Sequence, residues 1–378
     1  MKHFIIITLI AGALVACSNN KPTNDLSRIL TVQNPANDGI FAEFFEIESI
    51  VPIETKDDFI ISNIKKVIWA DADNIIILDD KSCIFAINSR TGKAKFSIDK
   101  KGQAPGESKN ICDITFDTLS RNIIVLNDYK KILFFDMDGK FLYEESVKKL
   151  YENIVYDRGN AILYNPGEGY GCYPYCIDVY NIQNKSWKHE GDDTKLEFPF
   201  RPYGRLIVKS KQIWFSAPLG YQIGRITEDY KFDFPYTLKT EKQITKDMIE
   251  LATSNYMSFS RKIREEGIIY GISSIRETDN FLVFKTNRIP LLMMSKNGLT
   301  VEGYRRVFDK NIKVRLANYF PHDGDDNRIM FIVQPNEWKE RETPKNIPPH
   351  IQSLVDSVKI EDDNNPILMF YKEKNKSF

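Results

Sequence analysis

One phrase of the sequence occurs twice, with its two copies roughly 48 residues apart. The first copy reads Asn-Ile-Ile-Ile-Leu-Asp-Asp from Asn74, and a second apolar segment and a Gly-Lys pair at Gly92 follow it. The second copy reads Asn-Ile-Ile-Val-Leu-Asn-Asp from Asn122, and it is also followed by an apolar segment and a Gly-Lys pair, here at Gly139. Repeats of this length are units that cannot bury their apolar faces alone and must stack on neighbours. The pattern therefore predicts a β-propeller.

The composition agrees with an all-β chain and argues against one class of partner. The 24 Phe and 18 Tyr residues favour strands, because flat rings pack well on a pleated surface. A length of 378 residues is compatible with a single closed β unit. The 52 Lys and Arg residues are balanced by 52 Asp and Glu residues, so no net charge draws the chain to nucleic acid. We expect no nucleic-acid partner.

Residues 1–16 have the pattern of a signal peptide. Lys2 and His3 precede an apolar stretch that is shorter than the roughly 20 residues of a membrane-spanning helix. The stretch ends in Leu-Val-Ala-Cys at Cys17, which resembles the lipobox of bacterial lipoproteins. The resemblance implies that Cys17 is acylated and becomes the new amino terminus, and two or three acyl chains anchor a protein stably. A soluble secreted protein cleaved after Ala16, with an incidental Cys17, is the alternative.

The segment after Cys17 is polar and poor in apolar residues, so residues 17–40 are predicted to be a flexible tether. Ser18 after the lipidated cysteine resembles an outer-membrane sorting signal. The expected location is the cell envelope, as an outer-membrane lipoprotein whose body faces either the periplasm or the cell surface. Residues 41–378 are expected to form one propeller domain.

Alternating apolar segments divide that domain into six units. They cover 64–98, 111–145, 154–181, 205–236, 271–305 and 316–333. The sixth unit lacks its later strands, and two strand-like segments at the ends of the domain, 44–54 and 366–372, can supply them. A ring closed in this way leaves no open sheet edge. The predicted fold is therefore all-β, a six-bladed β-propeller closed by strands from both termini.

Two helical inserts interrupt the β pattern. Apolar residues between 240 and 267 fall at three- and four-residue steps, with Thr240 and Gln243 as a possible capping box and Gly267 as a C-cap. Residues 347–358 form a shorter candidate that opens with two prolines. Either insert can simply pack on the propeller or shape the rim of a binding mouth.

Three segments resemble those of a known family. Residues 50–55 are similar to its Ile-Pro-Leu-Glu-Thr strand, residues 101–107 to its Gly-x-Gly-Pro-Gly-Glu turn, and residues 365–371 to its closing strand. The chain thus resembles six-bladed β-propeller lipoproteins related to NHL-repeat propellers, which occur in Gram-negative bacteria. Ala104 stands where that family has Gly.

The glycine-rich turn is predicted to have a structural role. Gly102 and Gly106 are expected to adopt positive φ, and Glu107 to accept backbone donors. Phosphate binding is disfavoured, because the turn lacks the Lys-Ser/Thr of a P-loop and does not open a helix.

Motifs for catalysis are scarce. Three histidines remain after the leader is removed, and no Gly-x-Ser-x-Gly motif occurs, so we assign no catalytic residue. The acidic segment that begins with His322 and Asp323 could suggest a metal loop, but its spacing is that of an ordinary turn. We predict no metal site and no cofactor. Metal ligands drawn from separate blades would leave no motif.

The strongest ligand-binding candidates are aromatic and basic residues in two loops, together with the acidic segment. They are Tyr164, Tyr170, Tyr173, Tyr175, Arg201, Tyr203, Arg205, His322 and Asp323. Aromatic faces with polar rims suit carbohydrates or peptides. The alternative is that these tyrosines only cover the loops. In a compartment that permits disulfides, Cys172 and Cys176 are the candidate pair, ahead of Cys83 with Cys112.

Two functional hypotheses follow. The first is a membrane-anchored binding or scaffold module for a carbohydrate, a peptide or a partner protein. The second is a propeller hydrolase or lyase acting on a sugar or lactone, with a metal or carboxylates in the channel. Carboxylates that converge at metal-ligand distance would favour the enzyme, and a channel lined by Tyr, Arg and backbone would favour the binder.

Overall fold

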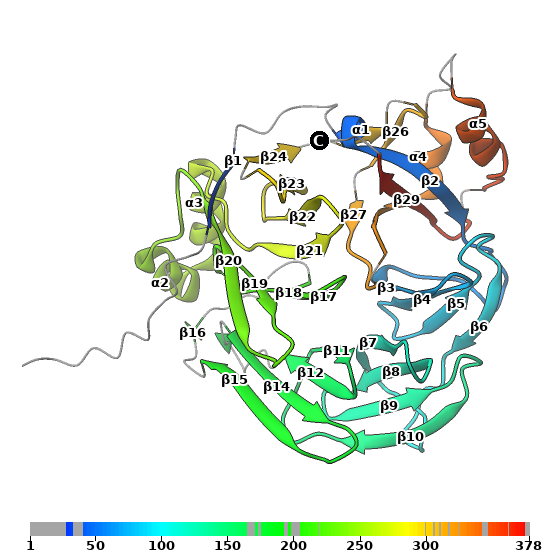
Figure 1. The fold of residues 1–378 in the computed structure, drawn as a ribbon, viewed down its shortest axis with the longest axis horizontal. Coiled ribbons are helices and arrows are strands. Elements are labelled where there is room, and N and C mark those ends of the chain that lie inside the picture. The colour runs from blue at the N-terminus through cyan, green and yellow to red at the C-terminus, as the bar shows by residue number, and fades with distance from the viewer. Residues whose placement is uncertain are drawn as a thin grey trace, which may run out of the picture.

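The computed structural model of the chain shows a six-bladed β-propeller (Figure 1). It describes residues 28–32, 41–164, 171–172, 175–192, 196–197, 205–217, 219–298, 300–304, 307–309, 311–316, 318–324, 326–341, 347–361 and 363–374. Each blade is a four-stranded antiparallel sheet, and the six inner strands surround a common axis. The predicted fold class is confirmed.

The two repeated phrases form blades 1 and 2. Blade 1 contains β3 (Ile64–Asp71), β4 (Asn74–Asp79), β5 (Ile84–Ile87) and β6 (Ala94–Ile98). Blade 2 contains β7 (Ile111–Asp117), β8 (Asn122–Asn127), β9 (Lys131–Phe135) and β10 (Phe141–Ser146). Every residue of β4 is buried, because the strand lies inside its sheet and the sheet lies between two other blades. Burial on both faces explains the unbroken apolar run in this strand.

Blades 3 to 5 follow the same order with longer interruptions. Blade 3 contains β11 (Asn153–Asp157), β12 (Asn160–Tyr164), β14 (Tyr175–Asn181) and β15 (Trp187–Asp192). Blade 4 contains β17 (Ile207–Lys209), β18 (Ile213–Ser216), β19 (Gln222–Ile226) and β20 (Phe232–Lys239). Blade 5 contains β21 (Ser273–Glu277), β22 (Phe281–Lys285), β23 (Leu291–Ser295) and β24 (Thr300–Tyr304). Two short pairs accompany them, β13 (Gly171–Cys172) with β16 (Leu196–Glu197), and β25 (Phe308–Asp309) with β26 (Val314–Arg315).

Blade 6 closes the ring with strands from both ends of the domain. Its order is β27 (Asn318–Phe320), β28 (Arg328–Val333), β29 (Ile367–Glu373) and β2 (Phe45–Pro52). Ile50 lies opposite Met369 in the antiparallel β2–β29 pair. The buried Asn365 amide reinforces the closure, since it accepts from the Ile61 amide and donates to the Phe59 carbonyl, both at 2.8 Å. The predicted closure is confirmed.

A further strand lies outside the blades. β1 (Arg28–Val32) runs parallel to β20 and to β24 and joins the outer edges of blades 4 and 5. Leu30 is fully buried there in a cluster that includes Trp214 and Val301. β1 falls within the range 17–40 that the sequence predicts to be a tether, so an ordered part of the chain begins before residue 41.

The helices lie in the connections between strands. α2 (Lys246–Ser254) and α3 (Tyr256–Glu266) form the predicted insert, and α5 (Pro349–Asp356) is the second one. Two short helices, α1 (Phe41–Phe44) and α4 (Pro335–Lys339), were not predicted. None of the helices in the described ranges is long and apolar enough to cross a membrane.

Capping of the helical insert differs partly from the prediction. The N-cap of α2 is Thr245, whose hydroxyl accepts from the Met248 amide, whereas the Thr240 hydroxyl bonds to the Lys242 carbonyl. The predicted capping box at Thr240 is therefore wrong. Gly267 ends α3 at a φ of 71°, which confirms the predicted C-cap.

The glycine-rich turn uses its two glycines for different reasons. Gly106 has a φ of 80°, as predicted. Gly102 is not in the left-handed region, but a Cβ at this position would lie 1.8 Å from the Glu107 carboxylate. That carboxylate accepts from the Ala104 amide at 3.1 Å, as expected. Glycine at position 102 therefore leaves room for the Glu107 carboxylate, which a side chain there would displace, and the predicted positive φ is wrong.

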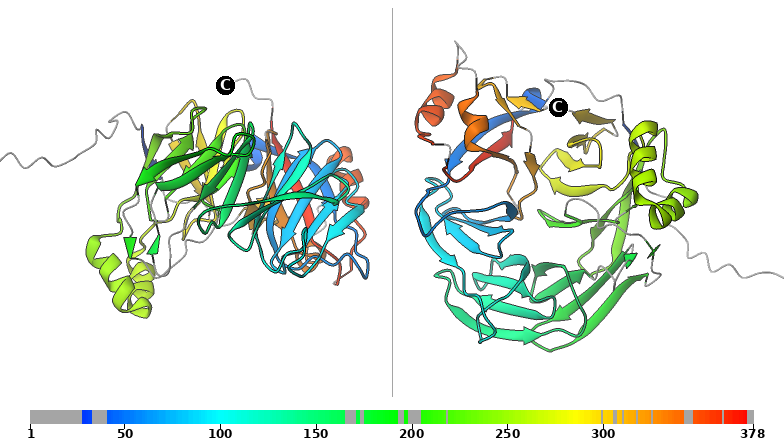
Figure 2. Two further views of the ribbon diagram at one scale, coloured as in Figure 1. Left: turned by 90° about the horizontal axis from the view of Figure 1, so that it is seen from below. Right: turned by 180° about the vertical axis from the view of Figure 1, so that it is seen from behind.

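The alternating strand directions give the ring two distinct faces. We call the face at which the six inner strands begin the upper face, and the opposite one the lower face. Each connection from an outer strand to the next inner strand lies on the upper face, and the α2–α3 insert is one of these, since it joins β20 to β21. Figure 2 shows this insert projecting from one face of the ring.

Candidate functional site

A cavity of about 260 Å³ lies on the propeller axis at the upper face, and we call it the axial well. Residues from all six blades line it, mostly from the first positions of the inner strands. They are Lys65, Lys66, Leu78, Cys112, Asp113, Asn153, Arg205, Ser274, Lys285, Phe320 and Pro321. A cavity on the axis that every blade helps to line is where a propeller can surround a ligand most completely.

The segment Pro321–Gly324 crosses the axis beneath the well. The Asp323 amide donates to the Val67 carbonyl at 2.9 Å, and the Trp69 amide donates to the Asp323 carbonyl at 2.8 Å. The Gly324 amide donates to the Lys209 carbonyl at 2.9 Å. Val67 and Trp69 belong to blade 1, and Lys209 belongs to blade 4 on the opposite side of the ring (Figure 1). The segment therefore forms a floor to the well.

Arg276 of β21 is buried and holds the floor segment in place. Its fully buried guanidinium donates to the carbonyls of His322, Gly324 and Asp326 at 3.2, 2.5 and 2.6 Å. It also pairs with the Asp326 carboxylate at 3.0 Å. A buried guanidinium is tolerated only when its donors are satisfied, so these bonds fix the course of the segment.

His322 and Asp326 complete the support. The imidazole is fully buried, and its Nε2 lies 3.0 Å from the Asp326 carboxylate. Burial and the Arg276 charge lower the pKa of His322 below its usual value. Burial alone would raise the pKa of Asp326, but His322 and Arg276 outweigh it and hold that pKa well below the usual range. Below the well, therefore, lies a rigid polar support.

Four charged side chains at the base of the well neutralise one another. The buried Lys66 ammonium lies 2.9 Å from the Asp113 carboxylate and 3.1 Å from the Asp323 carboxylate. Arg205 pairs with Asp323 at 2.9 Å. Burial would raise the pKa of Asp323, but Arg205 and Lys66 outweigh it and lower that pKa. Two cations and two anions thus form a compact network without net charge.

Lys285 at the end of β22 differs from these four side chains, because no described residue neutralises its charge. It lines the well, and its ammonium has no hydrogen bond or ion pair with any residue in the described ranges. Burial lowers its pKa, and no carboxylate opposes this effect. Lys65, another of the three lysines that line the well, is exposed and donates to the Ile111 carbonyl at 3.3 Å. The well therefore offers one desolvated, uncompensated positive charge.

The chemistry of the remaining well residues suits binding. Burial raises the pKa of the Cys112 thiol to about 12, so this cysteine is protonated at neutral pH and is a poor nucleophile. The Asp113 and Asp323 carboxylates are both engaged with Lys66. No group of His, Cys, Asp or Glu residues able to hold a metal ion occurs among the described residues.

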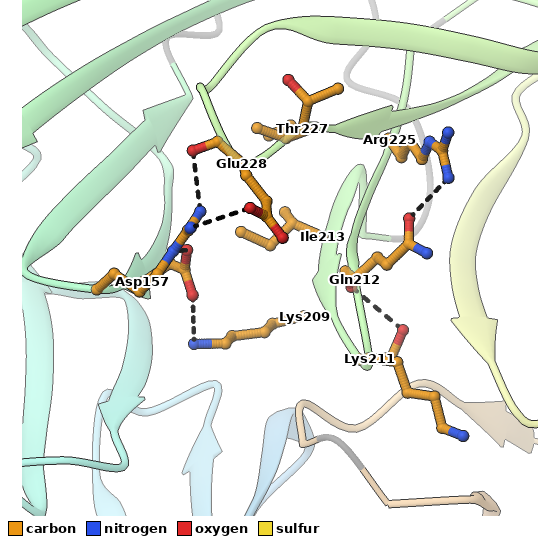
Figure 3. A pocket seen from close by; sticks show the side chains of 11 residues that line it. Asp157, Lys209, Lys211, Gln212, Ile213, Arg225, Thr227 and Glu228 are labelled. Atoms are coloured by element: carbon orange, nitrogen blue, oxygen red, sulfur yellow. Dashed lines mark hydrogen bonds and ion pairs between the residues drawn. The ribbon is translucent and has the colours of Figure 1, made fainter.

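A second, larger cavity of about 510 Å³ lies at the lower face between blades 3 and 4, and we call it the rim pocket. It is lined by Asp157, Arg158, Lys209, Ser210, Lys211, Gln212, Ile213, Arg225, Ile226, Thr227 and Glu228. Figure 3 shows Lys209 facing Asp157, and Arg225 reaching Gln212.

The cations of the rim pocket are compensated by nearby carboxylates. Arg158 pairs with Asp157 at 2.8 Å, and Lys209 pairs with the same carboxylate at 3.4 Å. Arg225 pairs with Asp233 at 2.7 Å, and Lys211 pairs with Asp279 outside the pocket. A ligand charge would have to displace these pairs, so the rim pocket is the weaker candidate.

The structure brings some of the predicted site residues to the axis. Arg205 lines the well, and Asp323 and His322 lie in and beneath its floor. Tyr164 instead packs in the core against Phe215, at a ring distance of 6.2 Å, and only 3% of it is exposed. Residues 322–327 were expected to form an ordinary turn, and the structure adds that His322 and Asp323 are buried in it.

Other predicted residues fall outside the described part of the chain. They are Cys17, Tyr170, Tyr173, Arg201, Tyr203 and the side chains of Cys172 and Tyr175. The Cys172–Cys176 disulfide therefore stays a prediction. Cys83 and Cys112 are free thiols.

Sequence reasoning missed Lys66, Asp113 and Lys285. A signal for the first two exists, because Lys66 and Asp113 occupy equivalent positions in the two repeats, each as a charge directly before a run of apolar residues in an inner strand. Lys285 gives no such signal, since a lysine that ends an apolar strand normally points to solvent.

Comparisons with known proteins agree with the fold. A structure from Bacteroides fragilis NCTC 9343, described as a "Putative exported protein", is similar over 92% of this chain and 100% of its own, with a TM-score of 0.73 and 15% identity. A member of the duf4221 family from Bacteroides vulgatus ATCC 8482 is similar over 88% of this chain and 99% of its own, with a TM-score of 0.50 and 8% identity. No curated protein matches the chain. A family model described as "Domain of unknown function (DUF4934)" matches residues 31–372, so the chain belongs to this family.

Proposed function

We propose that this chain is an extracytoplasmic binding propeller, anchored at the outer membrane through a lipid on Cys17, which takes a carbohydrate or peptide in the axial well. The signal-peptide pattern and the lipobox resemblance support export and anchoring. The similarity to a protein of Bacteroides fragilis described as exported is in accord with that location.

The observation that carries the binding role is the axial well itself. Its volume of about 260 Å³ suits one sugar ring or the end of a short peptide rather than a folded partner. The segment Pro321–Gly324 closes it below, so a ligand must enter from the upper face, where the α2–α3 insert also lies. The lining is held by strands rather than by loops, which favours a preformed site.

The same geometry does not supply the pair of carboxylates that a sugar hydrolase uses. Such enzymes need one protonated acid and one free carboxylate on opposite sides of the scissile bond. Asp113 and Asp323 instead share the Lys66 ammonium, and Arg205 binds Asp323 further. Both carboxylates are thus occupied by cations, which favours a binding module over a hydrolase.

A binding screen tests this function. We would titrate the protein that begins at Ser18, which keeps every described residue, with monosaccharides, sugar acids and short peptides by calorimetry. At least one compound should bind saturably, and Asn153→Trp, which fills the well, should abolish that binding. Gln212→Trp in the rim pocket is the matched control and should leave it unchanged. Absence of binding across the whole screen, or binding that survives Asn153→Trp, would contradict the proposal.

The anchor has a separate test. Labelling of cells that express the full chain with an alkyne fatty acid should mark the wild type and not Cys17→Ala. Fractionation should place the wild type with the outer membrane. An unlabelled wild type in the soluble fraction would show that Cys17 is incidental.

A further inference from the structure

We propose that the ligand of the axial well is a sugar acid whose carboxylate pairs with the Lys285 ammonium. This inference rests on the proposed binding function and names its substrate class.

Lys285 is the partly buried cation of the well whose charge no described residue compensates, so it is available to a ligand. Lys66 and Arg205 are neutralised by Asp113 and Asp323 at distances of 2.9 to 3.1 Å. Lys285 has no such partner among the described residues, although it is partly buried and lines the same cavity. A buried ammonium without a counter-charge is costly, and an anion that enters the well would remove this cost. The well is therefore complementary to an anion.

The surroundings favour a singly charged carboxylate over a phosphate. The partly buried Lys285 ammonium balances one negative charge, whereas a phosphate dianion usually meets several backbone amides or an arginine fork. No helix begins at any described residue that lines the well. The one guanidinium there, that of Arg205, is already bound to Asp323 at 2.9 Å and to the carbonyls of Ile207 and Pro321 at 3.3 and 3.4 Å.

The remaining walls suit a sugar ring. The Ser274 hydroxyl accepts from the Arg205 amide at 3.5 Å and keeps its own proton to donate. The Asn153 amide nitrogen lies 3.5 Å from Asp113, and its oxygen has no donor among the described residues. Phe320 and Pro321 add an apolar surface at the floor. Hydroxyl partners beside an apolar face match a pyranose, which presents both kinds of surface.

Calorimetry with matched sugars tests this assignment. The protein from Ser18 onward would be titrated with D-galacturonate and D-glucuronate, and with the neutral galactose and glucose. At least one uronate should bind about tenfold more tightly than its neutral counterpart. Lys285→Met, which keeps the length of the side chain and removes its charge, should abolish this preference. Lys211→Met in the rim pocket is the matched control and should preserve it.

Two further measurements show whether the preference is lost because the charge is missing or because the variant is unfolded. Thermal unfolding should show that Lys285→Met is folded and at least as stable as the wild type, because the substitution removes an uncompensated buried charge. Lys285→Arg should keep part of the preference for uronates, since it keeps the positive charge.

Each negative result would contradict a different part of the proposal. Equal affinity for uronates and neutral sugars, unchanged in Lys285→Met, would overturn the carboxylate assignment and leave the proposed binding function standing. Binding of short peptides through Lys285 without binding of uronates would overturn the sugar assignment. Failure of every compound in the wider screen would overturn the proposed function as well.

Discussion

The axial well and the rim pocket contain similar residue types but differ in how their charges are arranged. The rim pocket is about twice as large, and its cations are paired with carboxylates from neighbouring strands. The well is smaller and includes a buried, neutral network, the partly buried ammonium of Lys285 and the exposed ammonium of Lys65. Cavity size alone would select the rim pocket. An uncompensated charge in a cavity is the more informative signal, because a protein that does not use it would be more stable without it.

The largest expected effect comes from the network beneath the well. Lys66→Met leaves Asp113 and Asp323 buried without their shared cation, so we expect a loss of about 3–5 kcal/mol in the free energy of unfolding. Lys211→Met breaks a partly exposed pair in the rim pocket and should cost less than about 1 kcal/mol. Urea unfolding measures both. Equal losses would show that the two sites do not differ in the way described.

The floor of the well should be nearly as sensitive. Arg276→Lys keeps the charge but cannot reach three carbonyls and a carboxylate at once, so we expect a loss of about 2–3 kcal/mol. Arg225→Lys at the rim pocket is the matched control, and its exposed pair with Asp233 predicts a change within about 0.5 kcal/mol. A floor variant as stable as its control would mean that Arg276 does not hold the crossing segment.

Lowering the pH should reduce the free energy of unfolding, because three groups in the floor have lowered pKa values in the folded state. Asp323 and Asp326 have folded-state pKa values below their usual 3.8, so they stabilise the fold above that pH, and this contribution is lost as pH falls through the lowered values. His322 acts in the same direction from about pH 6.5 downward, because its pKa is lower in the folded state and the unfolded chain takes the proton first. The free energy of unfolding should fall steadily from pH 7 to pH 3. Asp326→Asn should flatten this dependence below pH 4, and an unchanged slope would contradict the assignment.

The smallest expected effect is a gain, rather than a loss, in the free energy of unfolding. Lys285→Met removes an ammonium whose pKa burial already lowers, so the variant should gain about 1 kcal/mol in the absence of ligand. Chemical unfolding of the two proteins side by side would detect this gain. A loss of stability would show that Lys285 has a structural partner and would weaken its assignment to the ligand.

The fold was predictable where each strand carries its own apolar pattern. Blades 1 and 2 match the predicted units 64–98 and 111–145 to within one residue, and the β2–β29 closure was found because both terminal segments are strongly apolar. The outer strand β15 of blade 3 was missed, since Trp-Lys-His-Glu-Gly-Asp contains one large apolar residue and its backbone pairing with β14 provides the rest of its stability. β1 was missed for a related reason, because it depends on two blade edges that exist only in the folded ring.

The site was less predictable than the fold. Arg205 and Asp323 were predicted as ligand-binding candidates for their residue types, and the structure shows a contact between them that the prediction did not include. Their partners Lys66 and Asp113 come from two other blades, and no spacing along the chain encodes a meeting point on the axis. Lys285 could not be recognised at all, because what distinguishes it is that no described residue pairs with its ammonium in three dimensions.

A crystal structure of the protein from Ser18 onward, grown with D-galacturonate, would test the central claim most directly. We expect the sugar in the axial well above Pro321, with a carboxylate oxygen about 2.8 Å from the Lys285 ammonium. A sugar seated in the rim pocket, or one in the well with its carboxylate turned away from Lys285, would contradict the account.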